Sequence, residues 1–355
     1  MNPSGPPILV SPLNWGLGHA SRCIPLVRAL LEADFEPVLA GDGSSLDLLA
    51  AEFPALRKYE LPSYDIRYAK DSRFFKLGLM FQGPHLFRAI EMEKTAIEKI
   101  IEEVKPAGII SDNRFGVRSS KVPSVYVTHQ LQVKAGWMTG LATRWHQKLI
   151  SGFDQCWVCD YSNLGSLAGT LSSDPGTLKN TKWIGPLSRF TQKKEVKKDI
   201  DVAVILSGPE PSRSLFQEKL MRELQGSNQK IILVEGLVDG EQNKRQELGL
   251  TIYNYLLSEE LETLINRSKM VISRSGYSSI MDLHAMGARA LLIPTPGQTE
   301  QEYLASYLEQ KGICHSVKED EFSLGSLRKA ADYPGFTKQK TSKSESLTSL
   351  FDVFR

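Results

Sequence analysis

The sequence predicts an α/β protein made of two doubly wound domains, each built on a parallel sheet. Short apolar, β-branched segments alternate with amphipathic helical segments along most of the chain. Many of these apolar segments end in loops rich in glycine, serine or proline, as parallel strands do before a crossover helix. The length of 355 residues is enough for two domains of ordinary size. We expect residues 1–186 to form the first domain and 187–355 the second.

The first expected strand, residues 7–11, leads into the glycine-rich loop Asn14-Trp15-Gly16-Leu17-Gly18-His19. Gly16 and Gly18 allow a ligand to approach the backbone closely. His19 stands where the next helix begins. A histidine at the carboxyl edge of a parallel sheet is well placed for chemistry, although a lone histidine in a loop is often only a surface residue. The loop is not a dinucleotide fingerprint, because Ser21 stands where the third glycine would be.

Further strands of the first domain are expected at 36–40, 108–112, 122–128 and 153–159, with a helix over about 88–104. The strand 108–112 ends in Asp112, followed by Asn113. Asp112 should face the same edge of the sheet as His19, unless it only forms an Asx-turn or a helix cap. The strand 122–128 ends in His129-Gln130, and 153–159 is expected to be the last strand of this domain.

The segment 73–81 mixes aromatic and cationic residues. It is consistent with a patch that binds an acceptor or a membrane surface, and also with a loop packed by its own aromatic side chains.

Expected strands of the second domain lie at 202–206, 231–235, 250–253, 270–273 and 290–294, and a terminal helix that could pack back on the first domain begins near 347. After the strand 202–206 comes Ser207-Gly208-Pro209, whose backbone amides could meet a phosphate.

The stretch 272–303 is a strand, a Ser/Gly turn, a helix and a second strand. Ser275, Ser278 and Ser279 place amides and hydroxyls at a helix start, where an anion is stabilised. One turn further, Asp282 could accept hydrogen bonds from a ribose diol. The alternative is an ordinary βαβ unit in which the serines only cap the helix.

Composition excludes several classes of protein. The 43 basic and 41 acidic residues nearly cancel, which does not favour a nucleic-acid binder. No apolar run approaches the ~20 residues of a membrane span, and the N-terminus does not resemble a signal peptide. We therefore expect a cytoplasmic protein, with peripheral contact at the inner face of the membrane as an option. Cys156 and Cys159 form a C-x-x-C within an apolar segment, and we interpret them as core residues.

The stretch 272–303 resembles the nucleotide-sugar signature of glycosyltransferase family 28, whose best-known member completes lipid II in peptidoglycan synthesis. Arg274-Ser275-Gly276, Asp282, Pro294 and Gln301 occupy the places of the family pattern. Two residues depart from it: Asp282 replaces a glutamate, and Glu302 replaces a second glutamine. The segment around His129 and 140–145 is similar to the family's acceptor-binding segment, with Gln130 in place of a glutamate.

The resemblance implies a GT-B fold, in which two Rossmann-like domains face each other across a cleft. It implies a metal-independent, inverting transferase of the hexosyltransferase type (EC 2.4), acting in cell-envelope polysaccharide synthesis. The donor would be a nucleotide-sugar, usually a UDP-sugar, serving as co-substrate with no other cofactor. The acceptor would be a glycan, a lipid-linked molecule or a small molecule. The implied donor-binding residues are Arg189, Ser207, Gly208, Leu257, Ser258, Arg274, Ser275, Gly276, Ser278, Ser279, Asp282, Gln301 and Glu302, and the acceptor-binding residues are Gly16, Gly18, Asn113, His129 and Gln130.

For catalysis we expect His19 to take the proton of the acceptor hydroxyl and Asp112 to orient it. Which of the two is the base stays open. Gly16-x-Gly18-His19-x-x-Arg22-Cys23 also resembles the start of UDP-sugar hydrolases of the same fold, which activate water instead. A non-catalytic nucleotide-sugar-binding protein is the third alternative.

Overall fold

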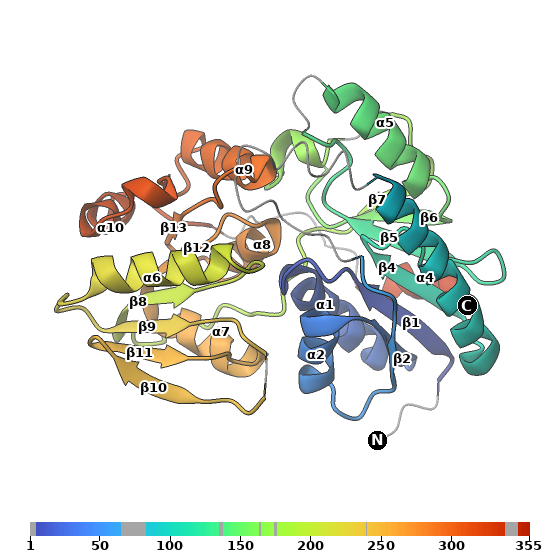
Figure 1. The fold of residues 1–355 in the computed structure, drawn as a ribbon, viewed down its shortest axis with the longest axis horizontal. Helices are drawn as coiled ribbons and strands as arrows, with labels where there is room; N and C mark the ends of the chain where they lie inside the picture. Colours follow the sequence, from blue (N-terminus) through green and yellow to red (C-terminus); the bar gives the residue numbers. More distant parts are fainter. Residues whose placement is uncertain are drawn as a thin grey trace. The chain divides into compact units, whose positions relative to one another are not determined.

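The computed structural model describes residues 5–64, 83–134, 138–162, 165–173, 176–238, 240–337 and 347–355 (Figure 1). The chain divides into two compact units. The first comprises Met1–Trp15, His19–Leu187 and Thr341–Arg355, and the second comprises Gly16–Gly18 and Ser188–Lys340. The segment 73–81 and its proposed surface lie outside the described residues.

The first unit is a parallel sheet of seven strands in the order β3-β2-β1-β4-β5-β6-β7. Its elements are β1 (Pro7–Pro12), α1 (Gly18–Glu32), β2 (Glu36–Gly41), α2 (Gly43–Glu52), β3 (Lys58–Glu60), α4 (Gly83–Val104), β4 (Gly108–Asp112), β5 (Ser124–Thr128), α5 (Thr139–Ile150), β6 (Gln155–Val158), η3 (Gly169–Leu171), β7 (Thr181–Trp183) and η5 (Leu347–Phe354). Every residue of β4 and β5 is buried, as expected for central strands covered on both faces.

Helix α4 covers one face of this sheet. Its apolar residues Ile97, Ile101 and Val104 share one core cluster with Leu9 of β1 and Ile109 of β4. These α4 side chains are spaced three and four residues apart, so they lie on one side of the helix. This apolar spacing is the pattern from which the sequence predicted a helix here.

The chain ends on the sheet of the first unit. In η5, Phe351 and Phe354 each lie 6.2 Å from the Trp157 ring of β6, measured between centroids. A Cβ atom at Gly108 would lie 2.1 Å from a ring carbon of Phe354, so only glycine lets the aromatic ring approach β4 this closely. The terminal segment forms a 3₁₀-helix and belongs to the first unit.

The second unit has a seven-stranded sheet in the order β10-β11-β9-β8-β12-β13-β14, parallel except for the β10–β11 pair. Its elements are β8 (Ile200–Ile205), α6 (Ser212–Leu224), β9 (Ile231–Val234), β10 (Lys244–Glu247), β11 (Leu250–Tyr253), α7 (Ser258–Arg267), β12 (Ser268–Ser273), α8 (Tyr277–Ala285), β13 (Ala290–Leu292), α9 (Thr299–Gln310), β14 (His315–Ser316), η4 (Glu319–Glu321) and α10 (Leu324–Ala331). Its core gathers apolar residues of β8, β9, β12 and α6.

One strand prediction was wrong. The segment 153–159 is not the last strand of the first sheet, because β7 follows it and pairs with β6 in parallel. The short edge strands β3, β7, β10 and β14 were not predicted. Lys58–Glu60 and Lys244–Glu247 are largely exposed and charged, so they lack the apolar run that marks a central strand. Cys156 and Cys159 are buried free thiols, as expected for core residues.

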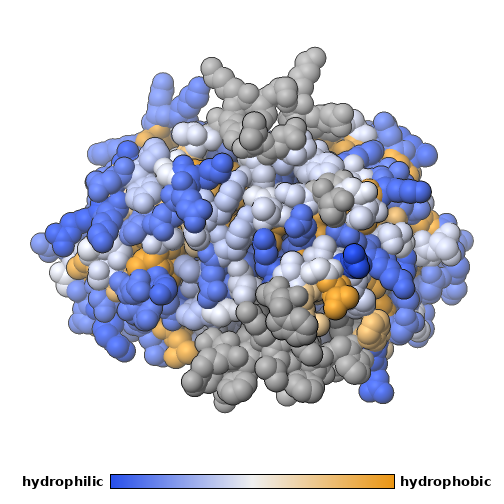
Figure 2. Space-filling view, turned by 90° about the horizontal axis from the view of Figure 1, so that it is seen from above, coloured by the Kyte–Doolittle hydropathy of each residue, from blue (hydrophilic) through white to orange (hydrophobic). Residues whose placement is uncertain are grey.

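Within the described part of the chain, no helix is both long and apolar enough to cross a bilayer. Figure 2 shows mainly hydrophilic residues on the visible face, with hydrophobic ones in separate small areas.

Candidate active site

In each sheet, the chain reverses its winding direction at one pair of neighbouring strands. In the first unit the pair is β1 and β4, with Pro12 opposite Asp112 in the parallel register. Loops that leave the carboxyl ends of such a pair diverge and leave room for a ligand. The loop after β1 leads to His19 at the start of α1, and β4 ends in Asp112. The topology therefore brings the two predicted catalytic residues to one place.

His19 and Asp112 are in direct contact. His19 Nδ1 lies 2.6 Å from Asp112 Oδ1. An ionised carboxylate can only accept hydrogen bonds, so Nδ1 must carry the hydrogen and Nε2 the lone pair. The imidazole is 13% exposed, whereas the carboxylate is fully buried. Only His19 of this pair has any accessible surface from which to accept a proton.

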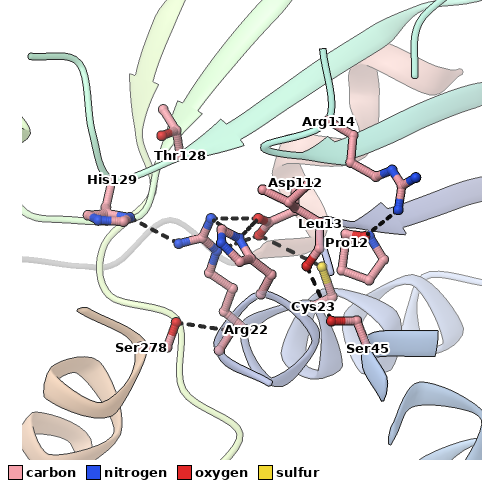
Figure 3. A network of polar contacts seen from close by, with 12 residues as sticks. Pro12, Leu13, Arg22, Cys23, Ser45, Asp112, Arg114, Thr128, His129 and Ser278 are labelled. Carbon is pink, nitrogen blue, oxygen red and sulfur yellow. Dashed lines mark hydrogen bonds and ion pairs between the residues drawn. The ribbon is translucent and has the colours of Figure 1, made fainter. Parts of the chain in front are cut away.

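Arg22 is the residue of this site to which the sequence analysis gave no role. It lies one turn after His19 on α1, on the same side of the helix. Its Nε donates to Asp112 Oδ2, and its Nη2 donates to Asp112 Oδ1 at 2.5 Å. Nη2 also lies 2.9 Å from His19 Nδ1, and Nη1 lies 3.0 Å from His129 Nδ1. Figure 3 shows the Arg22 side chain reaching between Asp112 and His129.

The charges of this cluster shift the pKa of each member. Burial, followed by the neighbouring Arg22 guanidinium, lowers the pKa of His19 below its ordinary value. Burial alone would raise the pKa of Asp112, but Arg22 and His19 outweigh it and lower that pKa. Burial raises the pKa of the Cys23 thiol strongly and that of Cys159 to about 12. At neutral pH the cluster therefore holds an ionised carboxylate, a guanidinium, a neutral imidazole and neutral thiols.

The predicted acceptor residues lie at this edge of the first sheet, with the exception of the two glycines. Asn113 follows Asp112 with a left-handed backbone (φ 57°), and its buried Oδ1 has no hydrogen-bond partner among the described residues. His129 directly follows β5 and contacts Arg22. The Gln130 carbonyl accepts from His146 Nε2 at 2.9 Å, which ties the loop to α5. Gly16 and Gly18 group with the second unit.

A second buried network holds the loops around Asp112. Arg114 is fully buried and pairs with Glu93 of α4 and with Asp42 after β2. Its Nη2 also donates to the Pro62 carbonyl after β3 at 2.8 Å. Asp42 accepts in turn from Asn14 of the glycine-rich loop at 3.1 Å. One guanidinium therefore ties together the loops after β2, β3 and β4. In the sequence, Arg114 is only a lone arginine after a predicted strand, with nothing to mark this role.

In the second unit the corresponding strand pair is β8 and β12. Ser207 and Gly208 follow β8, and Gly208 has a left-handed backbone (φ 105°). The residues 274–276 follow β12 and lead into α8. Gly276 is the N-cap of α8, and no side chain caps this helix end. Ser275 Oγ instead donates to the Gln301 carbonyl at 2.8 Å, so it does not serve as the cap of α8.

Ser278 and Ser279 lie in the first turn of α8. Ser278 Oγ donates to the Gly18 carbonyl oxygen at 2.8 Å. Gly18 is grouped with the second unit, to which Ser278 also belongs. Asp282 lies one turn further and accepts from Ser188 Oγ at 2.6 Å. Burial raises the pKa of Asp282 to about 6, although Arg189 and Ser188 act in the opposite direction. Asp282 and Arg189, predicted separately, therefore lie together.

Other predicted donor residues already have structural contacts. Arg274 is buried, stacks on Phe216 at 3.8 Å, and pairs with Glu319 at 2.6 Å. Its guanidinium also donates to the carbonyl oxygens of residues 293 and 294 after β13 and of Ser212, the first residue of α6. Burial lowers the pKa of Arg274, with Glu319 acting against it. These contacts make Arg274 a brace of the loop, and its role toward a donor stays a prediction.

Gln301 and Glu302 hold the segment before α9. Gln301 Oε1 accepts from the Thr295 amide at 2.8 Å, and Glu302 Oε1 accepts from the Gly297 amide at 2.9 Å. Leu257 is the N-cap residue of α7, and Ser258 begins that helix and is buried. Their contacts with a donor also stay predictions. Among the described residues, no group of His, Cys, Asp and Glu side chains is arranged as a metal site.

Comparison with known proteins adds to this geometry. Residues 212–349 match the sequence model of the glycosyltransferase family 28 C-terminal domain. A relative from Clostridium perfringens is 26% identical over 325 residues, which cover 88% of this chain and 86% of the relative. That relative is a UDP-N-acetylglucosamine--N-acetylmuramyl-(pentapeptide) pyrophosphoryl-undecaprenol N-acetylglucosamine transferase. The chain is therefore similar to family 28 glycosyltransferases, as the sequence resemblance predicted.

Solved glycosyltransferases share its fold. The glycosyltransferase of kitacinnamycin superposes with a TM-score of 0.61 at 14% identity, over 99% of this chain and 95% of that one. The Streptomyces sp. SF2575 enzyme SsfS6, complexed with thymidine diphosphate, gives 0.59 at 14% identity, over 98% and 99%. The predicted α/β class, GT-B fold and family 28 resemblance are thereby confirmed.

Proposed function

We propose that this family 28 type protein transfers a sugar from a nucleotide-sugar, most simply a UDP-sugar, to an acceptor hydroxyl. The observation that carries the proposal is the neutral His19 imidazole, backed by ionised Asp112, at the strand pair where the first sheet reverses its winding. Support for the donor comes from the family 28 C-terminal domain and from the name of the Clostridium relative, which begins with a UDP-sugar.

The proposed reaction is a single displacement. His19 Nε2 takes the hydroxyl proton while the acceptor oxygen attacks the anomeric carbon, and the bond from that carbon to the diphosphate breaks. One displacement inverts the configuration at that carbon. The nucleoside diphosphate leaves with the bonding electrons, and the amides at the start of α8 would stabilise its charge. The mechanism we propose needs no metal, and we place it in the hexosyltransferase class.

For the acceptor we propose a glycan or lipid-linked molecule of the cell envelope, because the Clostridium relative is named for an undecaprenol-linked one. To reach a lipid-linked acceptor, the protein would have to bind the cytoplasmic surface of the membrane. Sedimentation with anionic vesicles tests this part separately, and absence of binding would favour a soluble acceptor.

The donor is tested first with a thermal-shift panel of UDP, GDP, CDP, dTDP and their sugars. A ligand at 100 times its Kd should stabilise the fold by about 2.7 kcal/mol. The Asp282→Ala variant is the control and should lose the shift. If no nucleotide shifts the melting temperature, the donor site and the transferase proposal both fail.

Turnover separates the remaining alternatives. With the donor known, release of nucleoside diphosphate is measured with and without candidate acceptors. His19→Ala should lose ~2–4 decades of rate while donor binding is kept. Unchanged turnover would remove His19 from the mechanism. Release of free sugar without any acceptor would favour a hydrolase, which Arg22 and the surrounding motif keep as the second candidate. Tight donor binding with no turnover at all would favour a binding protein.

A further inference from the structure

The Arg22 side chain contacts three polar residues of the His19 site. It is 2% exposed and lies within 3.0 Å of His19, Asp112 and His129. A buried arginine with one carboxylate partner is usually only an ion pair that offsets the cost of its own burial. Here the same guanidinium also lies against two imidazoles, which a simple ion pair does not require.

The Asp112 carboxylate is saturated by these contacts. Its Oδ2 accepts from Arg22 Nε and lies 3.9 Å from the Cys23 thiol, and its Oδ1 accepts from Arg22 Nη2 and from His19 Nδ1. It has no accessible surface. A substrate hydroxyl therefore has no open lone pair of Asp112 to approach, and the proton acceptor must be another group.

Charge counting shows what the guanidinium does to His19. An isolated His–Asp pair carries one negative charge, so a proton taken by the imidazole neutralises it. With Arg22 present the cluster starts neutral and becomes positive when His19 takes a proton. Like charges within ~4–6 Å disfavour that state. The other groups facing the cluster are His129 and the Cys23 and Cys159 thiols, which add no negative charge at neutral pH.

We propose that Arg22 is a positioning residue: it holds the Asp112 carboxylate that accepts the His19 Nδ1 hydrogen, and its charge keeps His19 neutral, so that His19 Nε2, rather than Asp112, is the proton acceptor. The proposal rests on the function given above, and it decides which member of the pair is the base. It also implies that the proton leaves His19 easily after each turnover. Arg22 does all of this through its contacts with Asp112 and His19.

The first test needs no turnover. The titration of His19 is followed by NMR on protein labelled with ¹³C at the histidine rings, with His19→Gln to assign its signal among the six histidines. In Arg22→Met the pKa of His19 should rise by about one to three units, because Asp112 then faces the imidazole alone. In Arg22→Lys the charge is kept and the pKa should stay near that of the wild type. In Asp112→Asn it should move the opposite way, downward.

These opposite directions separate the proposal from a structural role. If Arg22 only formed an ordinary buried ion pair, all three variants would have a lower melting temperature. The pKa of His19 would then not rise in one variant, stay unchanged in the second and fall in the third according to the charge removed. An unchanged titration in Arg22→Met overturns the proposal. If Arg22→Met does not fold, the other two variants still test the proposal. The pKa of His19 should fall in Asp112→Asn and stay near the wild-type value in Arg22→Lys. If neither result is found, the proposal is overturned.

The second test uses the pH profile of kcat/KM for the donor that the thermal-shift panel selects. The acid limb should move upward in Arg22→Met together with the NMR titration, and it should stay in place in Arg22→Lys. His19→Gln should lose at least a hundredfold, the low end of general-base catalysis. If the NMR shifts occur but no variant or wild type turns over any donor, the proposed function fails and the role of Arg22 stands. If His19→Gln keeps the wild-type rate while Asp112→Asn does not, Asp112 is the base and the proposal fails.

Discussion

Asp282 should make donor binding dependent on pH in a way that can be calculated from the structure. Its carboxylate lies on α8 beside Ser188, and burial raises its pKa to about 6. Two ribose hydroxyls both donate, so they need an acceptor that carries no hydrogen of its own. We therefore expect only the ionised form of Asp282 to hold the donor well.

The magnitude follows from the titration. With a pKa of about 6, roughly nine-tenths of Asp282 is protonated at about pH 5 and only a few per cent at about pH 7.5. The Kd of the donor should therefore rise about tenfold between these two conditions, which corresponds to about 1.4 kcal/mol.

The free energy of unfolding should fall as pH rises, whereas donor affinity should increase. The pKa is raised in the folded state, so the contribution of Asp282 is present below its ordinary pKa of 3.8 and is lost as pH rises through about 6. At neutral pH the ionised carboxylate should cost about 2–3 kcal/mol, and Asp282→Asn should recover part of that.

The assay is isothermal titration calorimetry with an intact nucleotide-sugar. An esterified diphosphate has no proton to release in this pH range, whereas a free nucleoside diphosphate does. Asp282→Asn is the matched control, because it keeps the shape and an oxygen for Ser188 but does not titrate. Its affinity should be weaker at neutral pH and nearly independent of pH. If the wild type shows no tenfold change, or if the asparagine variant shows the same change, another group controls the pH dependence.

The remaining predictions concern Arg114 and Arg274, two of the buried arginines that brace loops. Arg114→Met should cost about 3–5 kcal/mol in urea unfolding, because Glu93 is left without its cation in the core. The double variant with Glu93→Gln should recover much of this, and a cost below 1 kcal/mol would show that the network is dispensable. Arg274→Lys should cost about 2 kcal/mol, since an ammonium cannot stack on Phe216 and serve several carbonyls together. A lysine variant as stable as wild type would contradict this.

The central strands could be predicted because burial on both faces demands uninterrupted apolar runs. The segment 108–112 was placed at its observed bounds for this reason. Edge strands such as β7 and β10 could not be predicted. They need only one partner and face solvent, so their residues resemble those of a loop.

The site could be predicted only where topology decides position. Residues at the carboxyl ends of β1 and β4 must lie close together once the strand order is known, so His19 and Asp112 were found. Arg22 was missed although it lies three residues after His19. Spacing on a helix predicts which residues share one side of the helix, but it does not predict which residue elsewhere in the chain they contact. Its partner comes from a strand about 90 residues later, and only the fold brings them together.

Both units use buried arginines to hold the loops at the edge of the sheet. Loops at the winding reversal of a parallel sheet carry backbone groups and polar side chains that must be both ordered and near the surface. In each unit a buried arginine orders them: Arg114 and Arg22 in the first, Arg274 in the second. Each of these guanidiniums is paired with a carboxylate, so it is held as a fixed charge. The weakly acidic and basic groups are instead His19, which contacts Arg22, and Asp282, which accepts a hydrogen bond from Ser188. In this protein permanent charge is used to hold the loops, and the weakly acidic and basic groups are left for ligands.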